Sequence, residues 1–208
     1  KFYQNLSNWL PFYWEGYSQS THYTNVLSSS NKTIEELRSG YKESVRRALK
    51  KANAQITIRT DGSAETLVDL GRKSFARQGK DYPNDDSTVR NLVNECLKQG
   101  CGKVYLAIGE DSSVHSTALM VQDHGMMYYL IGGSDPEHHG SGAMNKLLDS
   151  AIEEAAQNGL DFNFEGSMVK GIDRFFASFG ASQVIVNKIE KDFSLPFTLR
   201  TALKALKK

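Results

Sequence analysis

The sequence predicts an α/β (α+β) fold, with one mixed, mostly antiparallel central sheet flanked by helices. Helical segments come first, three closely spaced strands follow, and a strand–helix–strand unit and a last strand come after them. Strands joined by short polar turns form an antiparallel meander, whereas a strand–helix–strand unit returns parallel to its first strand. The order of these elements therefore predicts a mixed sheet.

The first thirty residues are rich in aromatic side chains and are interrupted by Pro11 and Gly16. We expect residues 1–30 to be a lead-in that packs on the main domain, because exposed aromatic clusters are poorly tolerated in water. The alternative is the wall of a substrate groove. Residues 31–193 are expected to form the main domain, and residues 194–208 a basic amphipathic tail.

Thr33 and Glu36 have the spacing of a capping box, and an apolar stripe follows them, so one helix is expected over residues 34–51. Its other face carries basic side chains, typical of a solvated helix face, although it could also cradle phosphates. Further helices are expected at 64–77, from a cap at Ser87 or Thr88, at 143–158 and at 172–179. Strands are expected at 56–59, 103–109, 113–122, 126–132, 160–165 and 183–190.

Composition narrows the class of protein. The 208 residues carry a net charge of +1, which gives no general attraction to nucleic acid or membranes. No apolar run approaches the roughly 20 residues that span a bilayer. Cys96 and Cys101 lack a second pair of ligands at zinc-site spacing, so we expect free thiols in a reducing compartment, no metal, and a cytoplasmic protein.

A glycine-rich segment joins a strand to a helix. The strand ends in Gly132 and Gly133, and a loop containing Gly140 and Gly142 precedes the helix at 143–158. Such a connection can present backbone N–H groups and the positive end of a helix to an anion, which suits a phosphate-bearing cosubstrate. The alternative is that the glycines only form two turns.

These residues resemble the GNAT superfamily of N-acyltransferases. Residues 137–142, Glu-His-His-Gly-Ser-Gly, fall where that superfamily has its pyrophosphate loop for coenzyme A, Arg/Gln-x-x-Gly-x-Gly/Ala. Glu137 takes the first position and would oppose a phosphate. The resemblance implies acetyl-CoA or another acyl-CoA as cosubstrate. The implied binding residues are Ile131, Gly132, Gly133, His139, Gly140, Ser141 and Gly142.

Further blocks resemble the Fem-type branch of these proteins: Arg-Arg-Ala-Leu-Lys-Lys-Ala at 46–52, Phe-Asn-Phe-Glu-Gly at 162–166 and Phe-Phe-Ala-Ser-Phe-Gly-Ala at 175–181. Fem-type proteins add amino acids from aminoacyl-tRNA to peptidoglycan precursor peptides, using two GNAT-like lobes. The resemblance places this chain as the second lobe, so we expect a first lobe in the full-length protein. Phe176 stands where the Fem-type signature has Lys, near the general-acid Tyr of many GNAT enzymes; we interpret it as helix packing.

Acyl transfer to an amine has three requirements. A base must remove a proton from the amine, hydrogen-bond donors must stabilise the negative charge on the tetrahedral oxygen, and the acyl carrier must be held in line with the amine. Glu165 is the expected base, or else a surface carboxylate. Tyr128, Tyr129 and Ser167 are candidate proton donors, and only one of the adjacent tyrosines can face the cleft. Backbone N–H groups at 131–133 are the expected oxyanion donors. His138 and His139 could bind an anion when protonated or form part of a metal site, but without a nearby set of acidic or Cys ligands we expect exposed loop histidines.

Three functions stay open from the sequence. The first is transfer of an acyl group from acyl-CoA to the amine of a small molecule or peptide. The second is Fem-type transfer from aminoacyl-tRNA. The third is a non-catalytic lobe that binds a ligand.

Overall fold

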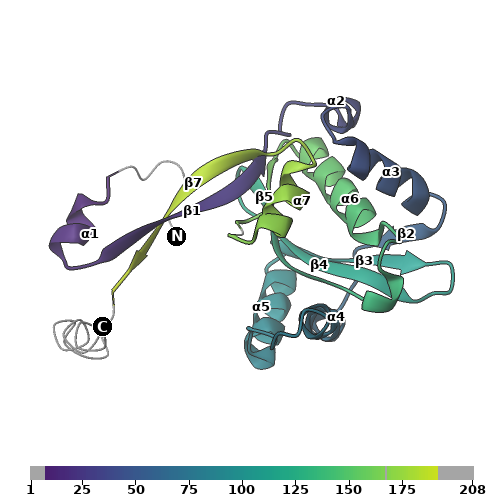
Figure 1. The fold of residues 1–208 in the computed structure, drawn as a ribbon, viewed down its shortest axis with the longest axis horizontal. Coiled ribbons are helices and arrows are strands. Elements are labelled where there is room, and N and C mark those ends of the chain that lie inside the picture. Colours follow the sequence, from purple (N-terminus) through teal and green to yellow (C-terminus); the bar gives the residue numbers. More distant parts are fainter. Residues whose placement is uncertain (1–7, 167, 192–208) are drawn as a thin grey trace. The chain divides into compact units, whose positions relative to one another are not determined.

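The computed structural model describes residues 8–166 and 168–191. In this part of the chain, seven strands form one sheet in the order β2-β3-β4-β5-β6-β1-β7 (Figure 1). Most neighbouring strands are antiparallel, and β5 and β6 are parallel, so the predicted mixed sheet is confirmed. No helix among the described residues is both long and apolar enough to cross a membrane.

The chain divides into two units, residues 24–183 and residues 1–23 with 184–208. The described part of the smaller unit contains α1 (Leu10–Trp14), the beginning of β1 (Ser18–Leu27) and most of β7 (Ser182–Glu190). Within it, the Gln19 side chain donates a hydrogen bond to Asn187 at 2.6 Å. The sequence analysis missed β1, because its polar residues lack the alternation that predicts a strand. The predicted tail at 194–208 lies outside the described residues.

The prediction of a single helix over residues 34–51 is wrong, because two helices occur there. The predicted capping box at Thr33 begins α2 (Ile34–Ser39), and α3 (Glu43–Ala52) starts after a break at Gly40 and Tyr41. The Tyr41 ring packs edge-on against Phe179, with ring centroids 5.2 Å apart. The break is therefore produced by packing on a distant segment, which the helical stripe could not indicate.

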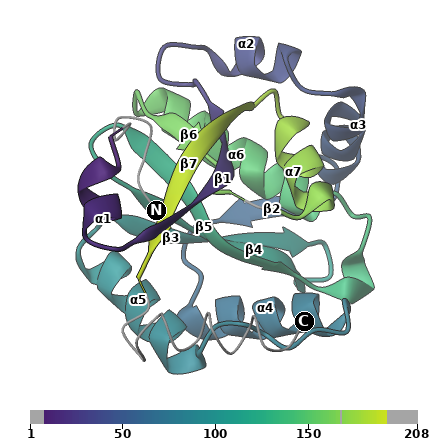
Figure 2. The same ribbon diagram turned by 60° about the vertical axis from the view of Figure 1, so that its left-hand side comes forward.

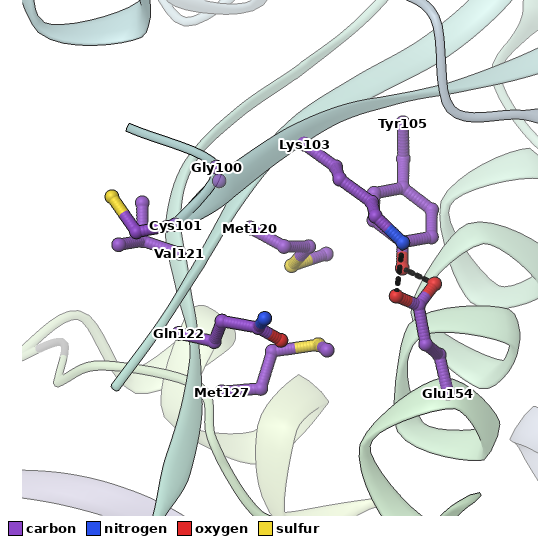
Figure 3. A pocket seen from close by; sticks show the side chains of 10 residues that line it. Gly100, Cys101, Lys103, Tyr105, Met120, Val121, Gln122, Met127 and Glu154 are labelled. Atoms are coloured by element: carbon purple, nitrogen blue, oxygen red, sulfur yellow. Dashed lines mark hydrogen bonds and ion pairs between the residues drawn. The ribbon is translucent and has the colours of Figure 1, made fainter. Parts of the chain in front are cut away.

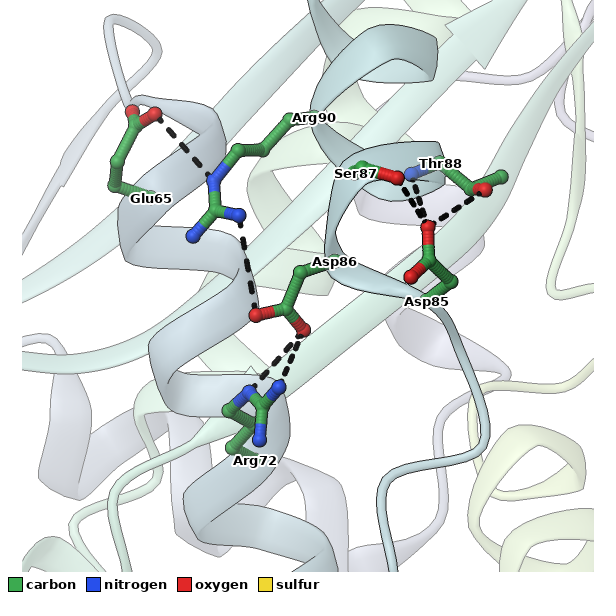
Figure 4. Close-up of polar contacts among 7 residues, drawn as sticks. All are labelled: Glu65, Arg72, Asp85, Asp86, Ser87, Thr88 and Arg90. Carbon is green, nitrogen blue, oxygen red and sulfur yellow. Dashed lines mark hydrogen bonds and ion pairs between the residues drawn. The ribbon is translucent and has the colours of Figure 1, made fainter.

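Helices α4 (Ala64–Ala76) and α5 (Asp86–Lys98) pack against each other beside the meander. Asp85 caps α5 by accepting from the Thr88 N–H at 2.9 Å, so the cap lies before the expected Ser87 or Thr88 (Figure 4). Asp86 accepts from Arg72 at 2.8 Å and lies 3.8 Å from Arg90. The pair with Arg72 joins α4 to α5, whereas the pair with Arg90 lies within α5. Such surface ion pairs contribute little individually.

The meander consists of β3 (Gly102–Gly109), β4 (Val114–Gln122) and β5 (Met126–Ser134), with β2 (Ile56–Arg59) antiparallel to β3. After β5, a 3-10 turn η1 (Pro136–His138) leads into α6 (Ala143–Gln157). The chain returns in β6 (Asp161–Asn163), parallel to β5, and continues through α7 (Lys170–Ala177) into β7. The predicted meander and parallel crossover are confirmed.

Two apolar cores lie on opposite faces of the sheet. Figure 2 shows α2, α3, α6 and α7 on one side of the sheet and α4 and α5 on the other. The larger is covered by α2, α3, α6 and α7 and includes Phe176, which stacks on Phe164 with centroids 5.1 Å apart. The packing role expected for Phe176 is thereby confirmed. The smaller core lies under α4 and α5. Cys96 is buried and Cys101 partly buried, and both are free thiols.

Candidate functional site

Strands β5 and β6 pair over only a few residues. Their parallel register runs from Met126 opposite Asp161 to Tyr128 opposite Asn163, whereas β5 continues to Ser134 along β4. In the described chain, the edge of β5 beyond Tyr128 therefore has no partner in β6. Backbone N–H groups on that edge can face a group outside the sheet.

The far end of this edge is held by α4. The Ser134 N–H donates to Ser74 Oγ at 2.7 Å, and the same hydroxyl donates to the Ser134 carbonyl at 2.9 Å. Ser134 thus directs its N–H away from β4. Because N–H directions alternate along a strand, Gly132 directs its N–H to the same edge. Of the three residues predicted to supply oxyanion donors, at positions 131–133, only Gly132 therefore directs its N–H to the unpaired edge.

The adjacent tyrosines point to opposite faces of β5. A register shift between Leu119 and Met120 leaves Leu130 as an extra residue, which forms a bulge next to Tyr129. The Tyr129 ring contacts Phe176 edge-on at 5.8 Å, on the face of the larger core. Burial raises the pKa of Tyr129 to about 12, so its hydroxyl stays protonated.

The Tyr129 hydroxyl lies directly over Gly132. A Cβ atom at position 132 would be only 2.1 Å from that oxygen. Gly132 therefore has a local reason to be glycine. The missing side chain at Gly132 leaves room for the Tyr129 hydroxyl against the backbone of β5.

Tyr128 and Glu165 form a second polar group. The Tyr128 hydroxyl donates to Asp123 at 2.9 Å. Burial, this hydrogen bond and the charges of Asp123 and Glu165 raise the pKa of Tyr128 to about 12. The Glu165 carboxylate therefore lies within electrostatic range of the Tyr128 hydroxyl.

Glu165 is held in a rarely populated backbone conformation. Its φ is 57°, the left-handed region that non-glycine residues avoid. The Glu165 N–H donates to the buried Asn163 Oδ1 at 2.8 Å, and that oxygen also accepts from Thr24 Oγ1 at 2.6 Å. Backbone strain of this kind is concentrated at functional sites. Thr24 and Asn163 are positioning residues that the sequence analysis did not assign.

A cavity of about 280 Å³ lies in front of α6. It is lined by the predicted loop residues His139, Gly140, Ser141 and Gly142, by Ser74 of α4, by Arg77 directly after α4, and by Ser134 of β5. Gly142 is the N-cap of α6 at a φ of 81°, and the Ala143 N–H donates to Ser141 Oγ at 3.2 Å. A loop and a helix N-terminus opening on a cavity can bind an anion.

Two basic side chains reach this loop from other elements. Lys51 of α3 donates to the Gly140 carbonyl at 2.7 Å, and Arg77 lies 3.4 Å from the His139 ring. Glu137 is exposed and does not line the cavity. Arg77 thus brings a guanidinium to a loop whose first position lacks one. The sequence contains no local signal for this pairing, because 62 residues separate Arg77 from His139.

Two predicted cofactor glycines also have packing roles. A Cβ at Gly133 would be 2.4 Å from the Leu70 backbone of α4. One at Gly142 would be 2.6 Å from the Ala48 carbonyl of α3. The lack of a side chain at these two positions lets α4 and α3 pack closely beside the site. Contact of either glycine with a ligand stays a prediction. Ile131 packs against the smaller core, and Ser167 lies outside the described residues.

A smaller cavity, of about 20 Å³, lies between β3, β4 and α6 (Figure 3). There Glu154 accepts from Lys103 at 2.6 Å and from the Tyr105 hydroxyl. This volume accommodates about one water molecule. The cavity before α6 is therefore the better candidate for a cosubstrate site.

The chain belongs to the acetyltransferase (GNAT) domain family, whose model matches residues 39–175. A search of curated proteins by sequence finds no significant match. Solved structures share the fold at low identity. FemX superposes with a TM-score of 0.70 at 15% identity, over 77% of this chain and 59% of FemX. This chain thus spans about three fifths of the length of FemX.

Two further solved structures are also similar to this chain. L-PGS from Bacillus licheniformis has a TM-score of 0.57 at 12% identity, over 94% of this chain and 69% of that one. The C-terminal domain of a putative lysylphosphatidylglycerol synthetase from Agrobacterium fabrum has a TM-score of 0.59 at 10% identity, over 95% and 67%. The chain is a GNAT-type acyltransferase domain with a Fem-like fold.

Proposed function

We propose that this protein transfers an acyl group, in the simplest case acetyl from acetyl-CoA, to an amine of a small molecule or peptide. The observation that carries the proposal is the cavity before α6, which shares Ser134 with the strand whose edge is unpaired. A carrier bound by its phosphates in this cavity can extend its acyl group along that edge. We place the reaction in the cytoplasm, because both cysteines are free thiols.

The phosphate end is assigned to the loop 139–142 and to Arg77. Backbone N–H groups at the start of α6 and the helix dipole favour an anion there. Arg77 lies 3.4 Å from His139 and supplies a fixed positive charge, which Glu137 cannot supply. The Arg77 guanidinium can also contact two phosphate oxygens at once.

The acyl end is assigned to Gly132 and Tyr129. The amine nitrogen attacks the thioester carbon, and the Gly132 N–H stabilises the resulting oxyanion. Collapse of the intermediate breaks the C–S bond and expels a thiolate, which takes up the proton that the attacking nitrogen then loses. With a pKa of about 12, Tyr129 is a weaker acid than a thiol at about 8.5, so it stabilises the thiolate by donating a hydrogen bond. Tyr129 thus supplies, from β5, the hydroxyl that Phe176 lacks.

Glu165 is assigned as the base that deprotonates the amine. An alkylammonium with a pKa near 10.4 must lose a proton before it attacks. The carboxylate, directly or through water, accepts that proton. Its electrostatic influence on Tyr128 and the hydrogen bond that fixes its backbone to Asn163 support this role.

Aminoacyl-tRNA is the alternative donor, with a peptidoglycan precursor peptide as acceptor. The basic residues Arg47, Lys50 and Lys51 of α3 and the fold shared with FemX support it. In that reading the cavity binds a phosphate of the tRNA end. A first lobe would complete the acceptor site.

Isothermal titration with acetyl-CoA, and separately with coenzyme A, tests the donor site. We expect micromolar binding that weakens about tenfold or more in Arg77→Gln, because a charge-assisted hydrogen bond contributes about 1.5–3 kcal/mol. Arg72→Gln is the matched control, since Arg72 is on the same helix, is exposed and pairs with Asp86. Equal loss in both variants, or no heat at all, would exclude coenzyme A at this cavity.

Single-turnover kinetics with an amine panel then test the chemistry. Glu165→Gln should keep carrier binding and lose about 100-fold or more in rate, as general-base losses do, whereas the exposed Glu35→Gln should not change it. Unchanged turnover in Glu165→Gln removes Glu165 as the base. Turnover with aminoacyl-tRNA alone selects the Fem-type donor, and carrier binding without any turnover selects a ligand-binding lobe.

A further inference from the structure

Two histidines and a carboxylate converge beside the cavity before α6. Asp111 comes from the β3–β4 turn, His115 from the start of β4 and His138 from η1. One potential ligand atom of each lies within 4.8 Å of the others. Sequence reasoning did not combine them, because His115 and His138 are far apart along the chain and neither has a metal-binding spacing.

His115 lacks the partners that a buried imidazole normally has. Its side chain is 11% exposed, and within the described chain neither ring nitrogen has a hydrogen-bond partner. The nearest carboxylate oxygen, Asp111 Oδ1, is 3.7 Å from Nε2. Because buried polar groups are almost always satisfied, these two nitrogens indicate a missing partner.

The surroundings keep space for these groups. A Cβ at Gly109 would be 2.3 Å from His115 Nε2 and 2.8 Å from Asp111 Oδ1, so a side chain here would displace these two groups from their present positions. Ser113 Oγ donates to Asp111 Oδ1 at 2.7 Å and lies 3.1 Å from His138 Nε2. Hydrogen bonds of this kind orient the ligands of metal ions.

The imidazole rings of His115 and His138 lie face to face. They stack with centroids 3.7 Å apart and planes at 8°. Two positive rings at that separation would repel each other. Neutral imidazole is the form that binds metal ions, so this stacked arrangement is compatible with a ligand role.

We propose that Asp111, His115 and His138 bind a divalent transition-metal ion, with Zn²⁺ the best fit to two imidazoles and one carboxylate. Three protein ligands leave a fourth position for water. A four-coordinate ion with bonds of about 2.1 Å holds its ligand atoms about 3.4 Å apart. Binding therefore requires the cluster to close by about 1 Å and the stacked rings to tilt, and Asp111, which is 59% exposed, has the freedom to move.

Such an ion would connect the β3–β4 turn to η1. Because η1 immediately precedes the loop 139–142, the ion would fix the position of that loop. This role does not depend on which acyl donor the protein uses. The metal site and the proposed transferase activity can therefore fail independently.

Metal binding is measured on tag-free, chelator-treated protein. Titration with Co²⁺ should give visible absorption bands at one equivalent, and Zn²⁺ should displace them. We expect His115→Asn and His138→Asn each to weaken Zn²⁺ binding by about 100-fold or more, beyond the loss seen for outer-shell partners. His124→Asn is the matched control, because His124 is an exposed turn histidine outside the cluster.

The melting temperature provides a second test, for the case in which substitution of the buried His115 prevents folding. Asp111→Asn changes only an exposed turn residue, and an amide oxygen can still accept from Ser113. Zn²⁺ should raise the melting temperature of the parent protein and raise it much less in Asp111→Asn. Absence of Co²⁺ bands, or equal Zn²⁺ affinity in His138→Asn and His124→Asn, would overturn the proposal.

Discussion

Replacing Gly133 with alanine tests how closely α4 approaches β5. The new Cβ would lie 2.4 Å from Leu70 C, 2.5 Å from Gly71 N and 2.6 Å from Leu70 O. Non-bonded heavy atoms normally stay about 3.5–4.0 Å apart. Because all three neighbours are backbone atoms, no rotamer change relieves the overlap, and α4 must move away by about 1 Å.

The cost of this movement is at the upper end for overpacking, about 3 kcal/mol. For a chain of this size, 1 kcal/mol shifts the melting temperature by about 2–4 °C, so a drop of about 6–12 °C is expected. Acyl transfer should also fall, because α4 carries Ser74 and Arg77 to the site. Urea and thermal unfolding, followed by circular dichroism, measure the stability change.

Two other glycines calibrate the result. In Gly132→Ala the clash is with the tip of the Tyr129 side chain, which can move, so activity should fall more than stability. Gly171 lies in α7, and a Cβ added there would meet no neighbouring atom within 4 Å, so Gly171→Ala should stabilise the protein by about 0.5 kcal/mol. If the free energy of unfolding of Gly133→Ala lies within roughly 0.5 kcal/mol of the parent value, the range typical of surface substitutions, the close packing of α4 on β5 is wrong.

Three further outcomes are expected. Asp149→Ala should cost about 2–3 kcal/mol in urea unfolding, because it removes the buried acceptor of two Arg38 hydrogen bonds at 3.0 and 2.7 Å; a change below about 0.5 kcal/mol would contradict it. Thr24→Val should cost about 1 kcal/mol and slow turnover, since Asn163 then loses a donor; unchanged turnover would separate Thr24 from the site. The hydrogen bond from Lys73 lowers the pKa of Asp135, so Asp135 stabilises the fold above its unfolded pKa of about 3.9, and this stability is lost as pH falls through the lower folded pKa. Acid titration of unfolding should therefore be shallower below about pH 4 in Asp135→Asn, and an identical slope would refute the assignment.

Local patterns in the sequence predicted most of the larger unit. The meander, the parallel crossover and the cap at Thr33 depend on periodicity, short turns and side-chain capping, which act between residues close in the chain. The break at Gly40 and Tyr41 was missed for the opposite reason. Tyr41 leaves the helical path to pack on Phe179, and the Lys42 N–H donates to the Ser178 carbonyl.

The candidate site shows the same division. Gly140 and Gly142 could be proposed from sequence because a glycine-rich turn before a helix is a local pattern. The pairing of Arg77 with His139 and the placement of Tyr129 over Gly132 depend on how α4 and a strand bulge meet the loop. Neither contact leaves a spacing that can be recognised along the chain.

The sequence by itself determined the order of elements, the mixed sheet and the glycine-rich entry to α6, because hydrophobic periodicity and turn chemistry act locally. The tertiary structure decided which tyrosine faces which side of β5, which cation reaches the loop, and that Asp111, His115 and His138 meet. These depend on strand register and helix packing, which bring together residues that no local interaction connects. A shift of one residue in register would turn every side chain of β5 to the other face.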